Sequence, residues 1–131
     1  SGASFCTCGL IFKKEVLGRT GFFDESFIGE EELYEDQVFF VKLCLHEKVY
    51  ISSLCNNLYR QRPDSLMHGL EAGGLYLKGR LFFLNWLKLY LRKHDINNSK
   101  IKILLYWALF FSRYPLLYKI YNRVKTLSKN T

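Results

Sequence analysis

Two adjacent acids stand immediately ahead of an apolar run in "ELYEDQVFF", residues 32–40. Apolar residues from Phe39 onward recur at helical spacing, so Glu35 and Asp36 are predicted to lie in the first turn of a helix that starts near Tyr34. The helix dipole and the free backbone N–H groups of a first turn keep such a carboxylate ionised. An ionised carboxylate can accept a proton from a substrate hydroxyl, although a solvated helix start uses the same residues.

A second polar cluster lies in "LYRQRPDSLMHG", residues 58–69. Arg60 and Arg62 are two positions apart on a predicted strand, which places both guanidinium groups on one side. Such a pair suits a diphosphate or another oxyanion, because each guanidinium can donate two parallel hydrogen bonds. A turn containing Pro63 and Ser65 follows, and then His68. An exposed strand end with a surface histidine explains the same residues without any ligand.

The segments that must position these side chains in the N-terminal half mix short strands with helix. The alternating residues 5–12 predict a strand, and residues 13–20 predict one or two helical turns that end at Gly18. Acids and glycine in residues 21–32 indicate a loop. After the helix that starts near Tyr34, short strands are predicted over residues 49–53 and 55–62.

The C-terminal half is predicted to be helical throughout. Leucines from Leu77 to Leu91 share one face of a helix within residues 70–94, and aromatic residues occupy another face. The run "DINNS" supplies turn and capping residues. Two further helices are predicted, from about Lys100 to Ser112 and from Pro115 to about Thr126.

Composition bounds the class of protein. The chain has 131 residues, of which 49% are hydrophobic and 17% aromatic, enough for one folded domain. No apolar run approaches the roughly 20 residues of a membrane span. The four cysteines lack zinc-finger spacing and are predicted to be buried free thiols of a cytosolic protein. The opening Ser-Gly-Ala, with no initiator Met, leads us to expect a processed end, a tag remnant or a piece of a longer protein.

Charge divides the sequence into two halves. Residues 1–65 contain seven Lys/Arg and ten acids, whereas residues 66–131 contain twelve Lys/Arg and only two acids, Glu71 and Asp95. The overall net charge of +7 therefore comes from the second half. This asymmetry indicates that the two halves have different roles.

Three segments, in this order, carry a resemblance: "GFFDESF", "YEDQVFFVKLCLHEKVYI" and "YRQRPDSLMH". They resemble the second half of a family 2 glycosyltransferase of the GT-A fold, of the type that builds capsular or other surface polysaccharides. The resemblance covers roughly residues 3–68. It implies an enzyme that transfers a sugar from a nucleotide-sugar donor to a saccharide acceptor, which can be lipid-linked, with inversion at the anomeric carbon.

The resemblance also implies roles for individual residues. Asp36 matches the catalytic base of the family, which deprotonates the acceptor hydroxyl, and Glu35 matches its partner beside the acceptor. Asp24 and Glu25 match a loop that packs at the acceptor site. Of the remaining matches, Arg60 and Arg62 correspond to residues that contact the donor diphosphate, Ser65 to a substrate-binding residue, and His68, loosely, to a metal ligand.

The sequence departs from the family in lacking an Asp-x-Asp motif and a glycine-rich phosphate loop. In the family these hold the donor with Mg²⁺ or Mn²⁺. We therefore expect a C-terminal piece of the enzyme that binds no metal alone and is inactive alone, because positioning the donor supplies most of the rate. A cut sheet edge would favour a homodimer.

These observations predict an α+β fold dominated by helix. Residues 1–68 would form the acceptor side of a GT-A domain with few short strands, and residues 69–131 a basic, aromatic-rich region with a bundle of about three helices. Those helices either cover the catalytic domain, bind an anionic membrane surface or bind nucleic acid; the last is disfavoured because no nucleic-acid module is legible. The expected location is the cytoplasm, peripheral at the inner face of the membrane. The alternative class is a non-enzymatic helical module that binds a membrane or a protein partner.

Overall fold

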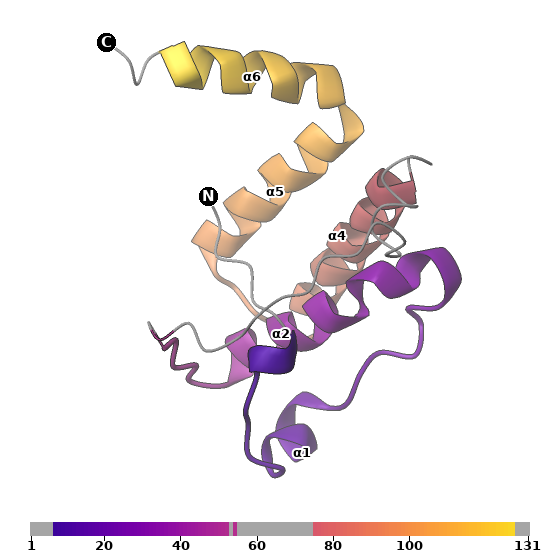
Figure 1. Cartoon of the computed structure of the whole chain (residues 1–131), viewed down its shortest axis with the longest axis vertical. Coiled ribbons are helices and arrows are strands. Elements are labelled where there is room, and N and C mark those ends of the chain that lie inside the picture. The colour runs from indigo at the N-terminus through magenta and orange to yellow at the C-terminus, as the bar shows by residue number, and fades with distance from the viewer. Residues whose placement is uncertain (1–6, 53, 55–74, 128–131) are drawn as a thin grey trace. The chain divides into compact units, whose positions relative to one another are not determined.

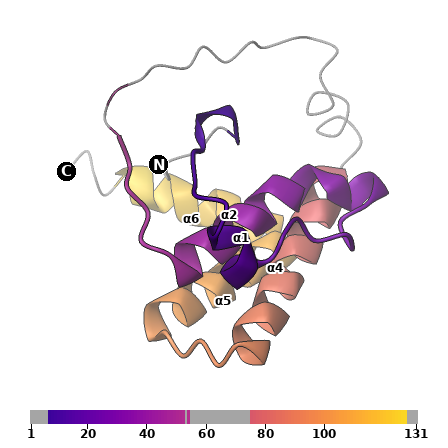
Figure 2. The same cartoon turned by 90° about the horizontal axis from the view of Figure 1, so that it is seen from below.

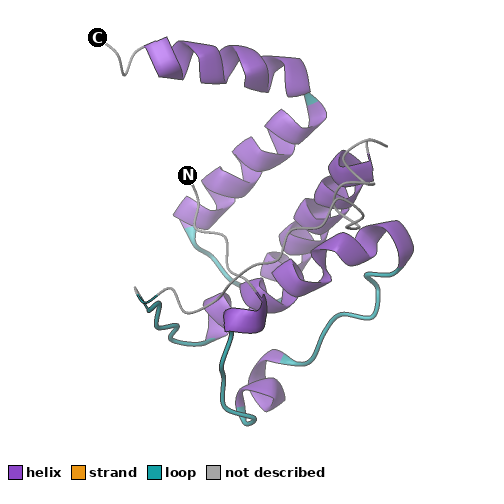
Figure 3. Cartoon of the chain, in the orientation of Figure 1, coloured by secondary structure: helices purple, strands orange, loops and turns teal. Residues whose placement is uncertain are grey.

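The structure is a computed structural model of the whole chain, and it describes residues 7–52, 54 and 75–127. The chain divides into two compact units, Ser1–Tyr76 and Leu77–Thr131. Each unit is described by itself below. The described part consists of helices and loops, without a strand, so the fold is dominated by helix as predicted (Figures 1 and 3).

The first unit is built around one helix, α2, which spans Glu35–His46. Before it come a 3₁₀ turn at Thr7–Gly9, the short helix α1 at Val16–Thr20 and a 3₁₀ helix at Gly29–Tyr34. Helix α1 contains Gly18 and ends instead at Gly21, whose φ of 72° is favourable only for glycine. The predicted end of this helix at Gly18 is therefore wrong.

The strand predictions fail where the structure describes them. Within residues 5–12 the chain forms the Thr7–Gly9 turn and then an irregular segment, and residues 49–52 pair with no other segment of the described chain. Alternating or β-branched residues make a strand only when a partner strand completes the ladder. The strand predicted at 55–62 lies outside the described residues.

The second unit contains three helices: α4 at Leu75–Lys93, α5 at Ser99–Arg113 and α6 at Pro115–Leu127. The first two residues of α4, Leu75 and Tyr76, belong to the first unit, and the remaining residues of the helix belong to the second. The three predicted C-terminal helices are confirmed, with ends that differ from the prediction by a few residues. The Asn98 side chain caps α5 by accepting a hydrogen bond from the Ile101 amide at 3.2 Å.

Helices α4 and α5 run antiparallel beside each other (Figures 1 and 2). Arg80, near the start of α4, donates a 3.1 Å hydrogen bond to the hydroxyl of Ser112, near the end of α5. Along α4 the rings of Phe83, Trp86 and Tyr90 stack in sequence, with centroids 6.3 and 4.9 Å apart. The predicted aromatic face of α4 is thus a continuous ladder of rings, separate from its buried Leu84 and Leu91.

Candidate functional site

Glu35 and Asp36 lie in the first turn of α2, as the sequence predicts. Both side chains are half-buried. Within the described chain, no hydrogen bond or ion pair occupies either carboxylate. The dipole of a helix favours negative charge near its N-terminus. An ionised carboxylate can accept a proton from a hydroxyl that reaches it.

Aromatic side chains pack one turn after this helix start, and we call them the aromatic floor. Phe39, one turn after Asp36, is 2% exposed and lies against two other rings. The Phe12 ring centroid is 5.4 Å away at a tilt, and the Phe23 centroid is 4.7 Å away in a stacked arrangement. The Phe23 contact presses the segment before Asp24 onto α2. Packing of α2 therefore also fixes the position of the loop that carries the other predicted acceptor residues.

A buried lysine forms the second attachment between α2 and this loop. Lys42 is 7% exposed and its ammonium donates a hydrogen bond to the Phe22 carbonyl at 2.5 Å. Burial lowers the pKa of the Lys42 ammonium, and the nearby Asp24 carboxylate partly opposes that shift. The Lys42 amine thus anchors the loop on both sides of Phe23.

Sequence reasoning did not identify Lys42 as a contact of this loop. The signal was present, because Lys42 follows Val38 by four residues and Phe39 by three. That spacing puts it on the same face as two fully buried side chains. A lysine in an apolar face is either solvent-reaching through its long stem or bonded internally, and here it is bonded internally.

The loop acids differ from each other. Asp24 is half-buried, and its Oδ1 accepts hydrogen bonds from the Ser26 amide at 3.1 Å and the Ser26 hydroxyl at 2.6 Å. Glu25 is exposed. Asp24 thereby shapes its own turn, a common role for aspartate. The loop is anchored at Lys42, whose Cα lies about 9 Å along the helix axis from that of Asp36. Asp24 therefore lies beside the middle of α2 and not beside its first turn.

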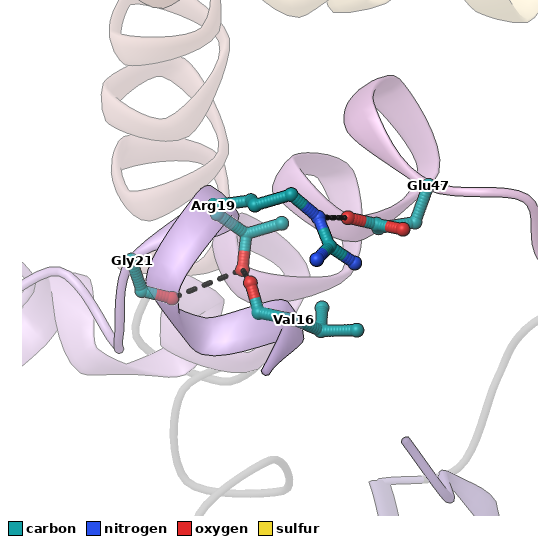
Figure 4. A network of polar contacts seen from close by, with 5 residues as sticks. Val16, Arg19, Gly21 and Glu47 are labelled. Carbon is teal, nitrogen blue, oxygen red and sulfur yellow. Dashed lines mark hydrogen bonds and ion pairs between the residues drawn. The ribbon is translucent and has the colours of Figure 1, made fainter. Parts of the chain in front are cut away.

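An ion pair joins α1 to the residue that follows the C-terminal end of α2. The Arg19 Nε of α1 donates to the Glu47 Oε1 just beyond α2 at 2.5 Å, and the two side chains face each other in Figure 4. The pairing raises the pKa of Arg19 and lowers that of Glu47. The Thr20 hydroxyl lies within hydrogen-bond distance of the carbonyls of Val16 and Gly21. The ion pair therefore links α1 to the residue just after α2, whereas the Thr20 contacts stay within α1 and its C-cap.

The donor-side predictions cannot be placed. Arg60, Arg62, Ser65 and His68 all lie outside the described residues. No cluster of three or more His, Cys, Asp or Glu side chains with metal-binding geometry occurs in residues 7–52 and 75–127. Cys44 is a free thiol, as predicted, but it is exposed, so the prediction of a buried thiol is wrong for this residue.

A pocket of about 610 Å³ lies in the second unit, near the turn between α4 and α5. Its apolar walls include the buried Leu91 and Leu105, and its charged walls include Lys88, Arg92 and Lys102. None of the predicted site residues lines it. Asp95 also lines the pocket, so its charged lining consists of three cations and one acid.

Comparison with known proteins returned no match to a protein-family model, a curated protein or a solved structure. Among the described helices, none is both long enough and apolar enough to cross a membrane.

Proposed function

We propose that this chain forms the acceptor side of a family 2-like glycosyltransferase. The full-length enzyme transfers a sugar from a nucleotide-sugar donor to a saccharide or lipid-linked acceptor in polysaccharide biosynthesis, with inversion. The observation that supports the proposal is the position of Asp36, half-buried in the first turn of α2 without a competing partner in the described chain. The ordered segments "GFFDESF", "YEDQVFF" and "YRQRPDS" supply the substrate class by resemblance.

In the proposed reaction, Asp36 accepts the proton of the acceptor hydroxyl. The acceptor oxygen then forms a bond to the anomeric carbon of the donor sugar, while the bond from that carbon to the diphosphate oxygen breaks. The electron pair of the broken bond leaves with the nucleoside diphosphate. Glu35, one residue earlier, is proposed to hold the acceptor, and the loop at Asp24 and Glu25 to border it.

The donor side of the proposal rests on the sequence alone. Arg60 and Arg62 are proposed to contact the diphosphate, because paired guanidinium groups complement it, and Ser65 is proposed to bind substrate. Mg²⁺ or Mn²⁺ is proposed for the full-length enzyme, with His68 as a ligand from this chain. Because the sequence lacks an Asp-x-Asp motif, donor and metal binding are proposed to depend largely on another part of the full-length enzyme, and the isolated chain is proposed to be inactive.

The direct test is Asp36→Asn in the full-length protein. Removal of a general base should lower kcat by about 10²- to 10⁴-fold, while the affinity for the donor changes by less than about twofold because Asn keeps the shape of the side chain. Glu32→Gln is the matched control, since it removes one charge from the exposed end of the same acidic segment. Turnover of Asp36→Asn within a few-fold of wild type would remove Asp36 as the base.

Location and assembly are proposed from the same reasoning. The enzyme would work in the cytoplasm, peripheral at the inner face of the membrane, where a lipid-linked acceptor is within reach. A homodimer is proposed from the sequence alone, and nucleic acid is not proposed as a partner.

One observation favours a second candidate function, a non-enzymatic helical module. The second unit exposes several large apolar side chains on α5 and α6, which a protein or membrane partner could cover. An Asp-x-Asp motif after a β/α repeat, upstream in the parent reading frame, would support the enzyme. A parent without such a motif would leave the binding module as the better proposal.

A further inference from the structure

Helices α5 and α6 present aliphatic side chains that the described chain does not cover. On α6, Leu116 is 74% exposed and Ile120, one turn later, is 59% exposed. On α5, Leu104 is 70% exposed and Ile103 57%. Soluble surfaces expose single apolar residues routinely, but a run of them on two consecutive helices marks an interaction surface.

Aromatic contacts hold α6 against α5 by its other side. The Phe111 ring of α5 lies 5.4 Å from the Tyr118 ring and 5.2 Å from the Tyr121 ring, centroid to centroid. At about 100° per residue, Tyr118 and Tyr121 lie on the side of α6 roughly opposite to Leu116 and Ile120. The tyrosines therefore fix α6 on α5, and Leu116 and Ile120 point away from that contact.

Nearly all charged side chains of this region are cationic. Residues 77–131 contain twelve Lys/Arg and a single acid, Asp95. On α6, the exposed Lys119 and Arg123 lie on successive turns beside the edge formed by Leu116 and Ile120. An apolar edge flanked by cations, on a helix too short to span a bilayer, is the arrangement of helices that lie in the interface of anionic membranes.

We propose that α5 and α6 dock on the surface of an anionic lipid bilayer. Leu116 and Ile120 enter the boundary between headgroups and acyl chains, and Lys119 and Arg123 contact lipid phosphates. A second copy of this chain fits less well, because it would bring two strongly cationic surfaces together. Nucleic acid would use the cations but not the aliphatic edge. The proposal is independent of the glycosyltransferase, since it uses neither Asp36 nor any other residue of the first unit.

The experiment measures sedimentation of the complete 131-residue chain with vesicles. Vesicles of phosphatidylcholine with phosphatidylserine should bind it, vesicles of phosphatidylcholine alone should bind it at least tenfold less, and added salt should weaken the binding. Ile120→Asn should reduce the affinity for the anionic vesicles by about tenfold or more, because the inserted aliphatic group is lost. Lys119→Gln should reduce it by about fivefold.

Ile51→Asn is the matched control. Ile51 has the same side chain and nearly the same exposure as Ile120, 62% against 59%, but lies in the first unit. Its substitution should leave vesicle binding unchanged. Circular dichroism and urea midpoints equal to those of wild type would show that neither substitution unfolds the chain, as expected at exposed positions.

A spectroscopic readout reports where the bilayer contacts the chain. The two tryptophans, Trp86 and Trp107, both lie in the second unit, and Trp107 is 48% exposed on α5. With Trp86→Phe in place, anionic vesicles should shift the emission of Trp107 to the blue. The same shift in Ile51→Asn, and its loss in Ile120→Asn, would support the assigned face.

Several results would overturn the proposal. These are equal binding to neutral and anionic vesicles, absence of vesicle binding, or wild-type binding by Ile120→Asn. A dimer in solution that Ile120→Asn dissociates would assign the face to a second copy instead. Binding to a single-stranded oligonucleotide that depends on Lys119 but not on Ile120, without vesicle binding, would assign it to nucleic acid. None of these results would change the expectation for Asp36→Asn.

Discussion

Helices α2 and α6 are nearly equal in length, 12 and 13 residues, but they use their apolar side chains in opposite ways. On α2, Val38 is 0% exposed and Phe39 2%, although apolar residues surround much of the helix. On α6 the aliphatic residues Leu116 and Ile120 lie on one side of the helix, yet both remain exposed. The apolar residues of α2 hold the first unit together, whereas those of α6 are available to a partner.

The largest expected effect is on the buried ring of α2. Phe39→Ala should destabilise the chain by about 3–5 kcal/mol, because it removes a large side chain from between Phe12 and Phe23 and leaves a cavity. The free energy of urea-induced unfolding measures the loss. A change below about 1 kcal/mol would show that the stacked rings do not form the core of the first unit.

A smaller effect is expected at the buried lysine. Lys42→Met keeps the length of the stem but removes the donor to the Phe22 carbonyl, and should cost about 1 kcal/mol near neutral pH. The pH dependence gives the sharper test. The pKa of Lys42 is lowered in the folded state, so the unfolded chain binds more protons as pH rises toward the unfolded value of about 10.4.

The sign of that linkage is definite. The pH-dependent part of the Lys42 contribution is fully present above the unfolded pKa and is lost as pH falls through the folded pKa. The contribution that remains near neutral pH is the hydrogen bond to the Phe22 carbonyl. Wild type should therefore gain stability relative to Lys42→Met between the lowered pKa and about pH 10.4. A difference in urea midpoint between the two proteins that stays constant across this pH range would contradict the assignment of a buried, internally bonded ammonium.

Ile120→Ala, the counterpart of Phe39→Ala on α6, should change the free energy of unfolding by no more than about 0.5 kcal/mol, because the side chain is already in water. The same urea titration applies. A cost comparable to that of Phe39→Ala would mean that α6 is packed internally, and the contrast between the two helices would fail.

The smallest effect is expected at the exposed ion pair. Arg19→Gln should leave the urea midpoint almost unchanged, and the slight loss should disappear in high salt, because solvent and ions screen exposed pairs. A large loss that persists in high salt would contradict a solvent-screened pair of small energetic weight.

Helix positions were predictable from the sequence because their signals are local. Pro115 marks the start of α6, Asn98 caps α5, and the acids at Glu35 and Asp36 mark the first turn of α2. The prediction of a strand over residues 5–12 failed in the described residues 7–12, because a short apolar run becomes a strand only through pairing with another segment. Local composition contains no information about such a partner.

The candidate site was predictable to a smaller extent. The first-turn position of Asp36 followed from periodicity, and its role came from the order of three segments. The anchoring of the Asp24 loop by Lys42 did not follow, because a lysine is expected in solvent unless the fold brings an acceptor to it. The exposed edge at Leu116 and Ile120 was equally hidden, since periodicity identifies an apolar face without showing what covers it.

Hydrogen exchange with and without phosphatidylserine-containing vesicles tests the contrast between α2 and α6 most directly. The amides of Leu117 to Arg123 should exchange at least several-fold more slowly with vesicles present, because insertion suppresses local opening of α6. The amides of Phe39 to Leu43 should exchange at the same rate in both conditions. Vesicles that protect α2 as strongly as α6, or that leave α6 unprotected, would contradict the division of the chain into a self-packed unit and a membrane-docking unit.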